Sequence, residues 1–308
     1  MIDAKIVEQA RGADMLAFLE RRQGFTFAHR GGVYRCQQHP SLAVKDDRLS
    51  WYWHSKGIGG HGAIDYLVKV EAMPFRQAVE TIARIPAAAP ISREPLPEKI
   101  LILPPKAGLL QARLWEYLCH RRGIDGSIVT TLLGEGRIYE DKRGNVVFLG
   151  FDEQGAARFA SLRGTYGDQQ FRMDCAGSDK HYGFHMGNAP SERLYIFESP
   201  IDAMSHATLE QAITGDREAW RRENRLSLAG TSDTALPRYL EAHPHIRELV
   251  LCLDNDAAGR EAAVAIARKY VVKGYHTRVE LPHGKDYNDD LLKHRAARRK
   301  VTREEACL

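Results

Sequence analysis

The last third of the chain alternates short strand-like runs with stretches of helical periodicity, and this alternation restricts the fold more than any other feature of the sequence. Helical spacing of apolar residues covers Ile201–Ala212 and Ala257–Val272. The strand-like runs lie before, between and after these stretches: Leu194–Phe197, Leu226–Ala229, Leu249–Leu253 and Arg278–Leu281. Short strands separated by helices predict a parallel sheet with helices on both faces. We therefore predict an α/β fold with a short parallel sheet for residues 193–292.

Acidic residues follow two of these predicted strands. Glu198 comes directly after the first strand, Asp202 lies one helical turn further on, and Asp254 and Asp256 follow the third strand. The carboxyl ends of parallel strands meet at one edge of a sheet, so these four side chains should gather there. Carboxylates in such a group repel each other unless a cation lies between them, and hard oxygen ligands select Mg²⁺ or Mn²⁺. The alternative is that Asp254 and Asp256 only cap the helix that follows and that Glu198 is a surface acid.

Proline separates the first part of the chain from the rest, because four prolines between positions 85 and 97 forbid a continuous helix. Before this segment we expect a small mixed α and β domain that ends in a helix from Ala63 to Ile82. After it we expect a helix over 109–119 and strands at Val146–Phe151 and Arg158–Leu162. The predicted organisation is a domain at 1–84, a linker at 85–104, a mixed region at 105–192, the α/β domain at 193–292 and a basic tail at 293–308.

Composition narrows the class of protein. The chain has 308 residues, of which 44% are hydrophobic and 27% charged, which is typical of a globular protein and excludes collagen-like and disordered chains. Lys and Arg exceed Asp and Glu by 44 − 40 = 4, a mild basic excess that permits a polyanionic partner. No apolar run approaches a membrane span, and the five cysteines are scattered without a Cys-x-x-Cys pair. We expect a cytoplasmic protein with reduced thiols and no membrane association.

Three motifs resemble the Toprim domain, which bacterial primases share with type IA and type II topoisomerases and certain nucleases. They are Glu198-Ser-Pro-Ile-Asp202, Asp254-Asn-Asp256-Ala-Ala-Gly259, and Gly284-Lys285-Asp286. Their order and spacing are more similar to the primase and phage primase-helicase version than to that of the topoisomerases. The resemblance implies that Glu198, Asp254 and Asp256 are catalytic, that Asp202 joins them in holding Mg²⁺ or Mn²⁺, and that Lys285 contacts nucleic acid or nucleotide.

The N-terminal region resembles the zinc-ribbon domain of bacterial primases in a degenerate form. Cys36 and His39 match the first ligand pair of that family, and His54 stands where the third ligand would be, but Gly57 occupies the fourth position. A structural zinc site needs four N or S ligands, so we expect the fold to persist and zinc to be absent unless His61 supplies the missing ligand. Cys36, His39 and His54 are then core or surface residues.

The middle region resembles the basic half of a primase catalytic core, in which a twisted sheet presents basic side chains to template and nucleotide. On this resemblance Arg158, Arg163 and Lys180 would neutralise phosphates; the alternative is that they are solvated surface charges. The consecutive Trp51, Tyr52 and Trp53 are candidates for stacking single-stranded bases. Neighbouring residues of a strand point to opposite faces, however, so at least one of the three belongs to the core.

The whole arrangement is most similar to Toprim proteins of bacterial mobile elements. It implies metal-dependent nucleotidyl transfer on single-stranded DNA with nucleoside triphosphates, for replication of a mobile element, with a replication helicase or another protein of the element as partner. Two alternatives stay open: a metal-dependent nuclease that uses the same carboxylates, and a noncatalytic nucleic-acid-binding accessory protein. We do not expect a topoisomerase, because these 308 residues leave no room for the domain that supplies a strand-cleaving tyrosine.

Overall fold

The computed structural model describes residues 4–30, 32–84, 100–108, 110–167, 171–187 and 190–305. The chain divides into two compact units, Met1–Leu96 and Pro97–Leu308. Most of the linker predicted at 85–104 lies outside the described residues, as do Leu109 and the last three residues of the predicted tail. Each unit is described by itself.

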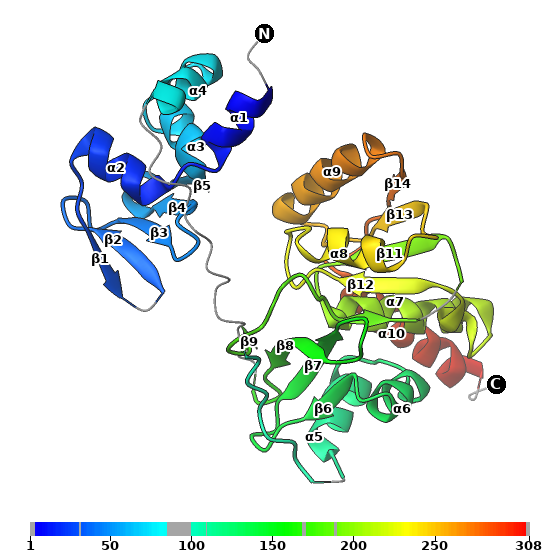
Figure 1. Ribbon diagram of the computed structural model, residues 1–308. Coiled ribbons are helices and arrows are strands. Elements are labelled where there is room, and N and C mark those ends of the chain that lie inside the picture. The colour runs from blue at the N-terminus through cyan, green and yellow to red at the C-terminus, as the bar shows by residue number, and fades with distance from the viewer. Residues whose placement is uncertain are drawn as a thin grey trace. The chain divides into compact units, whose positions relative to one another are not determined.

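Unit 1 is an antiparallel five-stranded sheet with four helices (Figure 1). The strands follow each other in chain order and in space, so that each pairs with the next. Its elements are α1 (Ala4–Arg11), α2 (Met15–Gln23), β1 (Phe27–Arg30), β2 (Val33–Cys36), β3 (Leu42–Lys45), β4 (Ser50–Trp53), the 3-10 turn η1 (His54–Lys56), β5 (Ile58–His61), α3 (Gly62–Lys69) and α4 (Phe75–Arg84).

The core of unit 1 uses alternate residues of β4. Trp51 and Trp53 are buried, and both rings contact the ring of Tyr66 on α3, with centroid distances of 5.4 and 6.3 Å. Tyr52 lies between them in sequence and is 45% exposed on the other face of the sheet. The predicted alternation is confirmed, and of the three aromatic side chains only Tyr52 remains accessible for stacking.

The single helix predicted from Ala63 to Ile82 is wrong, because the segment forms two helices. α3 ends at Lys69 and α4 begins at Phe75. Ala72 has a positive φ of 53°, and Pro74 lacks the N–H that a continuing helix would use. The apolar spacing on both sides of this break matches one helical period, so periodicity alone does not reveal the turn.

Unit 2 begins with a mixed region that contains a four-stranded antiparallel sheet, in the order β6-β7-β8-β9. The helix predicted over 109–119 is also different in the structure: α5 has only four residues and continues as a π-helical turn, η2, in which the N–H of Arg122 donates to the carbonyl of Tyr117 over 2.9 Å. The elements are α5 (Ala112–Trp115), η2 (Glu116–Arg121), α6 (Gly126–Gly134), β6 (Ile138–Glu140), β7 (Val146–Phe151), β8 (Ala157–Arg163) and β9 (Arg172–Asp174).

The second sheet of unit 2 confirms the predicted α/β fold. Its order is β10-β12-β11-β13-β14, in which the last four strands are parallel and β10 is an antiparallel edge strand. The elements are β10 (His185–Met186), β11 (Arg193–Phe197), α7 (Pro200–Thr214), the 3-10 turn η3 (Ala219–Arg222), β12 (Asn224–Ser227), α8 (Ala235–Ala242), β13 (Glu248–Leu251), α9 (Ala257–Val271), β14 (His276–Val279) and α10 (Tyr287–Glu305).

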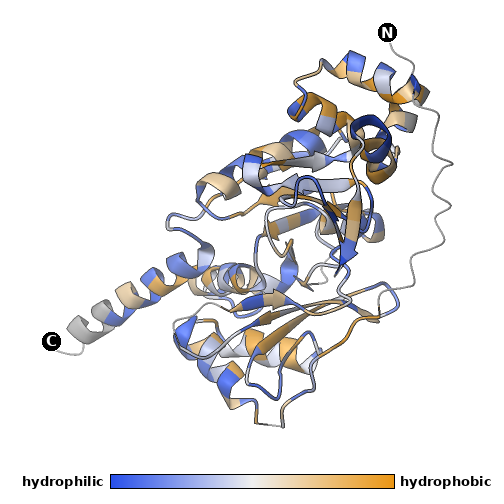
Figure 2. Ribbon diagram, turned by 90° about the vertical axis from the view of Figure 1, so that its left-hand side faces the viewer, coloured by the Kyte–Doolittle hydropathy of each residue, from blue (hydrophilic) through white to orange (hydrophobic). Residues whose placement is uncertain are grey.

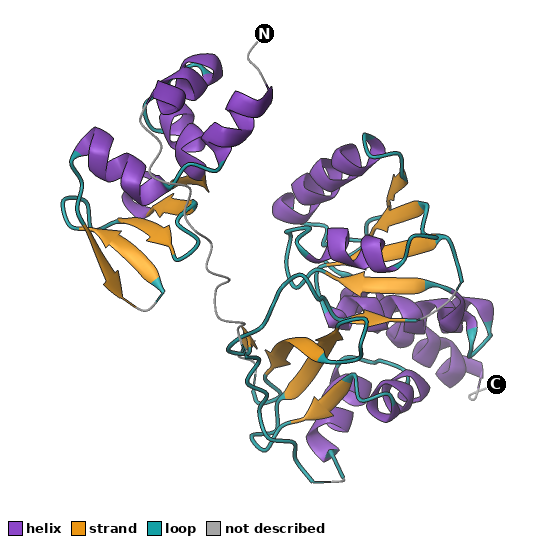
Figure 3. Cartoon of the chain, viewed as in Figure 1, coloured by secondary structure: helices purple, strands orange, loops and turns teal. Residues whose placement is uncertain are grey.

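Helices cover both faces of this parallel sheet (Figures 1 and 3). Tyr195 and Phe197 of β11 pack in one core with α7 and α10, and this core continues into η2, α6 and β7. Leu194 and Ile196 of the same strand point to the other face and pack in a core with α8 and α9. Figure 2 shows hydrophobic and hydrophilic residues alternating around the helices, as expected of helices that cover a sheet.

The basic segment predicted as a tail from Lys293 is helical as far as Glu305, so the predicted boundary at 292/293 lies inside α10. Within the described part of the chain, no helix is both long and apolar enough to cross a membrane.

Candidate active site

The parallel sheet brings Glu198 and Asp254 together. β11 and β13 are neighbouring parallel strands in which Ile196 lies beside Leu251, and the two acids follow the carboxyl ends of these strands. The backbone N–H of Asp254 donates to Oε1 of Glu198 over 3.2 Å. We call this end of the sheet, with the acids that gather there, the acidic edge.

Asp202 lies in the first turn of α7, whose N-cap is Ser199. The Ser199 hydroxyl donates to Oδ2 of Asp202 over 2.6 Å, and the backbone N–H of Asn288 donates to the same carboxylate. Asp202 is only 6% exposed. It is therefore a carboxylate fixed by hydrogen bonds from two separate segments of the chain.

Asp256 is the N-cap of α9, because its Oδ1 accepts a hydrogen bond from the N–H of Gly259 over 2.9 Å. Asp256 thus caps the helix, as one part of the alternative interpretation expected, and this bond uses only Oδ1 of the carboxylate. Gly259 is required by close approach: a Cβ there would lie 2.1 Å from the carbonyl oxygen of Asp254 and 2.7 Å from Oε1 of Glu198. The glycine lets the first turn of α9 pack directly against the acidic edge.

Asp286 is a fifth acid at this edge that the sequence analysis did not assign to the site. Its charge raises the pKa of both Asp202 and Asp254. The loop that carries it is held in place because the N–H of Asn255 donates to the carbonyl of Lys285 over 2.8 Å. The signal that could have identified it was present, since Asp286 belongs to the third motif, Gly284-Lys285-Asp286.

Burial and the charges of neighbouring acids raise the pKa of three acids at this edge, Asp254, Asp202 and Glu198. Burial, followed by the charges of Asp202, Glu198, Asp286 and Asp256, raises the pKa of Asp254 to about 7. Burial raises the pKa of Asp202 to about 6 against the opposing hydrogen bond from Ser199. Burial also raises the pKa of Glu198, and the charge of Asp256 adds to this effect. The edge is thus a concentration of negative charge that protons or a cation would neutralise.

A divalent cation fits the chemistry of this donor set. The side chains offer hard carboxylate oxygens, and burial together with neighbouring acids raises the pKa of Glu198 and Asp254. As the side chains stand in the described residues, no three from Asp, Glu, His and Cys form a group that could hold a metal ion. Binding an ion would therefore require Glu198, Asp254 and Asp256 to turn toward a common point.

Basic residues of the mixed region face the acidic edge. Arg163 and Arg172 are paired across β8 and β9. Burial lowers the pKa of Arg163, the neighbouring guanidinium groups of Arg122 and Arg172 lower it further, and Asp202 acts in the opposite direction. Arg172 and Lys285 in turn favour the ionised form of Glu198 and so act to lower its pKa. We call Arg122, Arg163, Arg172 and Lys285 the basic cluster; Arg122 and Arg172 were not assigned to the site from the sequence.

The two other basic residues assigned to the site from the sequence lie in ion pairs of their own. Arg158 contacts Asp152 over 2.7 Å at the end of β8 opposite to Arg163. Lys180 contacts Asp174 over 2.9 Å. A role in phosphate binding stays a prediction for both.

The three zinc-ligand candidates of unit 1 have protein partners. Cys36 is buried and its Sγ lies 3.5 Å from Oε1 of Gln38. The ring of His39 packs between Phe25 and Trp53, and that of His54 packs against Tyr52. The predicted likeness of unit 1 to a zinc ribbon and the role of these three side chains both stay predictions.

Comparisons with known proteins agree with the division of unit 2. Residues 195–291 match the family described as Toprim-like, and residues 116–189 match a family described as a protein of unknown function, DUF3991. An uncharacterised protein of Bacillus anthracis is 29% identical over 242 residues, covering 74% of this chain and 68% of that protein. A 65 kDa protein of Zymomonas mobilis is 27% identical over 283 residues, covering 83% of this chain, which spans only 46% of that protein.

Among solved structures, the primase fragment of the bacteriophage T7 primase-helicase protein is 16% identical, with a TM-score of 0.44, over 90% of this chain and 99% of that fragment. Because this score is below 0.5, the fold assignment rests on the strand order of the chain itself and on the family match. Three observations indicate the same domain: the parallel sheet, the three motifs at its carboxyl edge and the residues that match the Toprim-like family. The C-terminal part of the chain, residues 195–291, is a Toprim-like domain.

Proposed function

We propose that the chain is a primase-like enzyme that transfers nucleotides to a 3′-hydroxyl on single-stranded DNA, with the acidic edge as a site for Mg²⁺ or Mn²⁺. One observation carries the proposal: five carboxylates gather at the acidic edge, three of them with a raised pKa, and residues of the basic cluster lie close enough to act on these groups. An enzyme that joins nucleotides needs this combination, because cations must neutralise the reacting phosphates while positive side chains position the strand.

Each group has a specific task in this proposal. Glu198, Asp254 and Asp256 would hold the divalent ion, which when bound stabilises the negative charge that develops on the phosphoryl oxygens. Arg163 and Arg172 would bind the triphosphate or the strand backbone and place it against the acidic edge. The 3′-oxygen forms a bond to the α-phosphorus, the bond from that phosphorus to the bridging oxygen breaks, pyrophosphate leaves, and the hydroxyl proton passes to solvent.

Asp202 has a positioning task. It is buried and accepts hydrogen bonds from Ser199 and from the backbone of Asn288, so it connects α7 with the start of α10. Asn288 also donates to the carbonyl of Arg122 over 2.7 Å and to Ser205 over 3.0 Å. These bonds link the basic cluster to the acidic edge through one buried asparagine.

The experiment compares the wild type with the double variant Asp254→Asn, Asp256→Asn on single-stranded DNA with labelled nucleoside triphosphates and Mg²⁺ or Mn²⁺. Asparagine is an effective N-cap, so Asp256→Asn removes the charge and retains the cap of α9. The matched control is Asp216→Asn, a half-buried residue of the loop after α7 that lies outside the acidic edge and pairs with Arg222. We expect new labelled oligonucleotides from the wild type and the control and none from the double variant.

The same gel tests the nuclease alternative, because end-labelled DNA in a parallel reaction reports cleavage. If the DNA is shortened, and only when Asp254 and Asp256 are present, the site hydrolyses phosphodiester bonds instead of transferring nucleotides. Neither product, with DNA binding retained, would contradict both enzymatic functions and favour a binding protein. Replication of a mobile element and a helicase partner remain predictions from the sequence resemblance.

A further inference from the structure

The later turns of α10 carry a concentration of positive charge outside the candidate active site. Leu291 is fully buried in the core, whereas its neighbour Leu292 is already 39% exposed. Figure 2 shows α10 projecting beyond the neighbouring elements of unit 2. The sequence of this segment contains six basic residues and no acid before Glu304: Lys293, Arg295, Arg298, Arg299, Lys300 and Arg303. A helical segment with this charge is open to an anionic partner.

One side of α10 connects this segment to the basic cluster. Positions 288, 292, 295 and 299 follow each other at steps of four, three and four, which places them on one side of a helix. At the start of this side, Nη1 of Arg122 donates to Oδ1 of Asn288 over 3.2 Å. Gly123, the next residue after Arg122, lies against Arg295, because a Cβ there would be 3.1 Å from Cδ of the arginine. We call the part of this side formed by Arg295 and Arg299 the basic face.

The charges of the basic face do little to stabilise α10 itself. Cations stabilise the carboxyl end of a helix within its last turn, but Arg295 and Arg299 lie 305 − 295 = 10 and 305 − 299 = 6 residues before Glu305. They are also four residues apart, a spacing at which like charges repel and weaken a helix. Lys293 pairs with Asp289, but no carboxylate of the described residues forms an ion pair with either arginine. An anion bound between them would relieve this repulsion.

The composition of the segment indicates which kind of anion fits it. A helix that binds a membrane surface needs large apolar side chains on the face opposite to its charges. Residues 293–305 contain no aromatic residue, and their apolar residues are only Ala296, Ala297 and Val301, so such a face is missing. A nucleic-acid strand carries a phosphate on every nucleotide and is bound by arginines placed along its path. Continuity with the basic cluster therefore favours a strand that also reaches the acidic edge.

We propose that a single strand of nucleic acid bound at the acidic edge continues along α10, where Arg295 and Arg299 of the basic face contact its phosphates. From Asn288 to Arg299 there are 299 − 288 = 11 residues, which at about 1.5 Å per residue span about 16 Å. A stacked strand advances about 3.4 Å per nucleotide, so this side of the helix accommodates about five nucleotides. The proposal rests on the nucleic-acid binding of the proposed function, but not on nucleotidyl transfer.

Fluorescence anisotropy of a labelled 20-nucleotide DNA strand, titrated with the full chain at several salt concentrations, tests this in EDTA, which prevents cleavage. The variant Arg295→Gln, Arg299→Gln removes two charges from the basic face. The matched control Arg268→Gln, Lys273→Gln removes two exposed charges from α9 and the turn after it, on the other face of the parallel sheet. Two lost phosphate contacts should reduce the slope of log K against log salt concentration by about 2 × 0.7 = 1.4. We expect this reduction, with at least tenfold weaker binding at 0.1 M salt, and no change in the control.

Two further variants make the result specific. Arg295→Lys, Arg299→Lys keeps both charges and should retain the salt dependence of the wild type, because phosphate binding here depends on charge. If circular dichroism shows that the glutamine double variant is unfolded, Arg299→Gln at its exposed position replaces it and should reduce the slope by about 0.7.

Four results would overturn the proposal. If the glutamine double variant binds the strand like the wild type while Arg172→Gln weakens binding, the basic face is wrong and the proposed function stands. If the wild type binds no strand, both are wrong. An equal loss in the α9 control would reduce the effect to net charge. If polyglutamate displaces the strand as effectively as unlabelled DNA does, the basic face binds an acidic protein instead.

Discussion

Replacing Asp254 by asparagine should stabilise the metal-free protein at alkaline pH. The folded chain raises the pKa of Asp254 from an ordinary value of 3.8 to about 7 by burial and by the charges of the neighbouring acids. A group whose pKa is raised by folding favours the folded state while it is protonated, and that contribution is lost as the pH rises through the folded pKa. The wild type should therefore lose stability between about pH 4 and pH 7, and asparagine removes this loss.

The magnitude follows from the shift. About 3 pKa units at 1.36 kcal/mol each give an upper value of about 4 kcal/mol, and the partial solvent exposure of Asp254 reduces this to about 2 kcal/mol. For a unit of roughly 200 residues this corresponds to a rise in the melting temperature of about 4–8 °C. The hydrogen bond from residue 254 to Glu198 uses the backbone N–H, so the substitution keeps it.

The assay is thermal unfolding followed by circular dichroism in EDTA, at pH 5 and at pH 8.5, for the wild type, Asp254→Asn and the control Asp216→Asn. The pKa of Asp216 is lowered by a hydrogen bond from the backbone of Glu218, so its substitution should bring no stabilisation. We expect Asp254→Asn to melt above the wild type at pH 8.5 and the difference to shrink at pH 5. A melting temperature at pH 8.5 equal to or below that of the wild type would refute the electrostatic reasoning.

Two further substitutions test the basic cluster and the packing of the acidic edge. Arg172→Gln should weaken binding of single-stranded DNA and reduce the slope of log K against log salt concentration by about 0.7, as expected for one lost phosphate contact. Substitution of the exposed Arg268 on α9 by glutamine should change neither quantity. A filter-binding or anisotropy titration measures both. Gly259→Ala places a Cβ 2.1 Å from the carbonyl oxygen of Asp254 and should lower the free energy of unfolding by denaturant by about 1–3 kcal/mol. Gly134→Ala in α6, where nothing lies within 4 Å of the added Cβ, should be neutral or slightly stabilising. Equal effects of the two substitutions would contradict the packing argument.

The parallel sheet could be predicted from the sequence because its signals are local. The apolar runs of β11 and β13 and the helical spacing of α7 and α9 lie within a few residues of the observed bounds. Ser199 and Asp256 cap the two helices directly after the strands, so the same residues that end the strands also fix where the acids lie.

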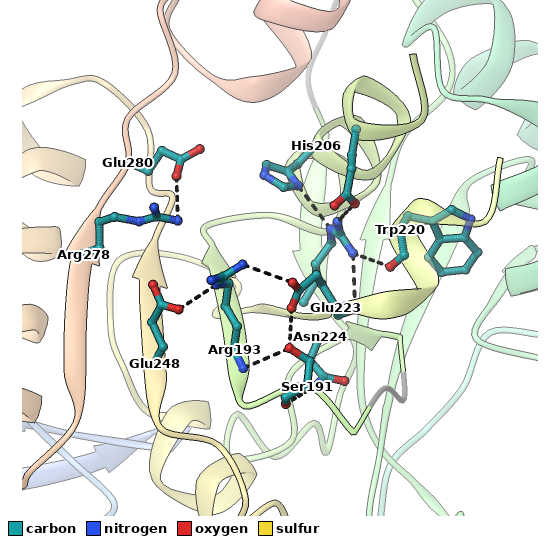
Figure 4. Close-up of polar contacts among 11 residues, drawn as sticks. Ser191, Arg193, His206, Trp220, Glu223, Asn224, Glu248, Arg278 and Glu280 are labelled. Carbon is teal, nitrogen blue, oxygen red and sulfur yellow. Dashed lines mark hydrogen bonds and ion pairs between the residues drawn. The ribbon is translucent and has the colours of Figure 1, made fainter. Parts of the chain in front are cut away.

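Other elements depended on partners far away in the chain. β12 begins at Asn224, two residues before the prediction, and includes the fully buried Arg225. The guanidinium of Arg225 donates to His206 of α7, which Figure 4 labels, and pairs with Glu210 of the same helix. A buried arginine in a central strand cannot be recognised until its partners are known. The short edge strand β10 was missed because two residues carry no periodicity.

The candidate site shows the same limit. Glu198, Asp202 and Asp254 could be assigned to the candidate site from the sequence because each follows a strand or begins a helix. Asp286 and Arg172 were not assigned, since they reach the site only when the start of α10 and the edge strand β9 fold back toward the acids. Arg158 was assigned by its position in a basic strand, but its side chain pairs with Asp152 at the other end of β8.

The central claim is that the acidic edge holds a divalent cation, and titration of Mn²⁺ followed by electron paramagnetic resonance tests it most directly. Mn²⁺ bound to protein loses the sharp signal of the free ion, so the spectrum counts bound ions without any need for activity. We predict at least one bound Mn²⁺ per chain in the wild type and in Asp216→Asn, displaced by Mg²⁺ and lost in Asp254→Asn, Asp256→Asn. If the wild type leaves Mn²⁺ free, or if the double variant binds it equally well, the acidic edge is not the metal site.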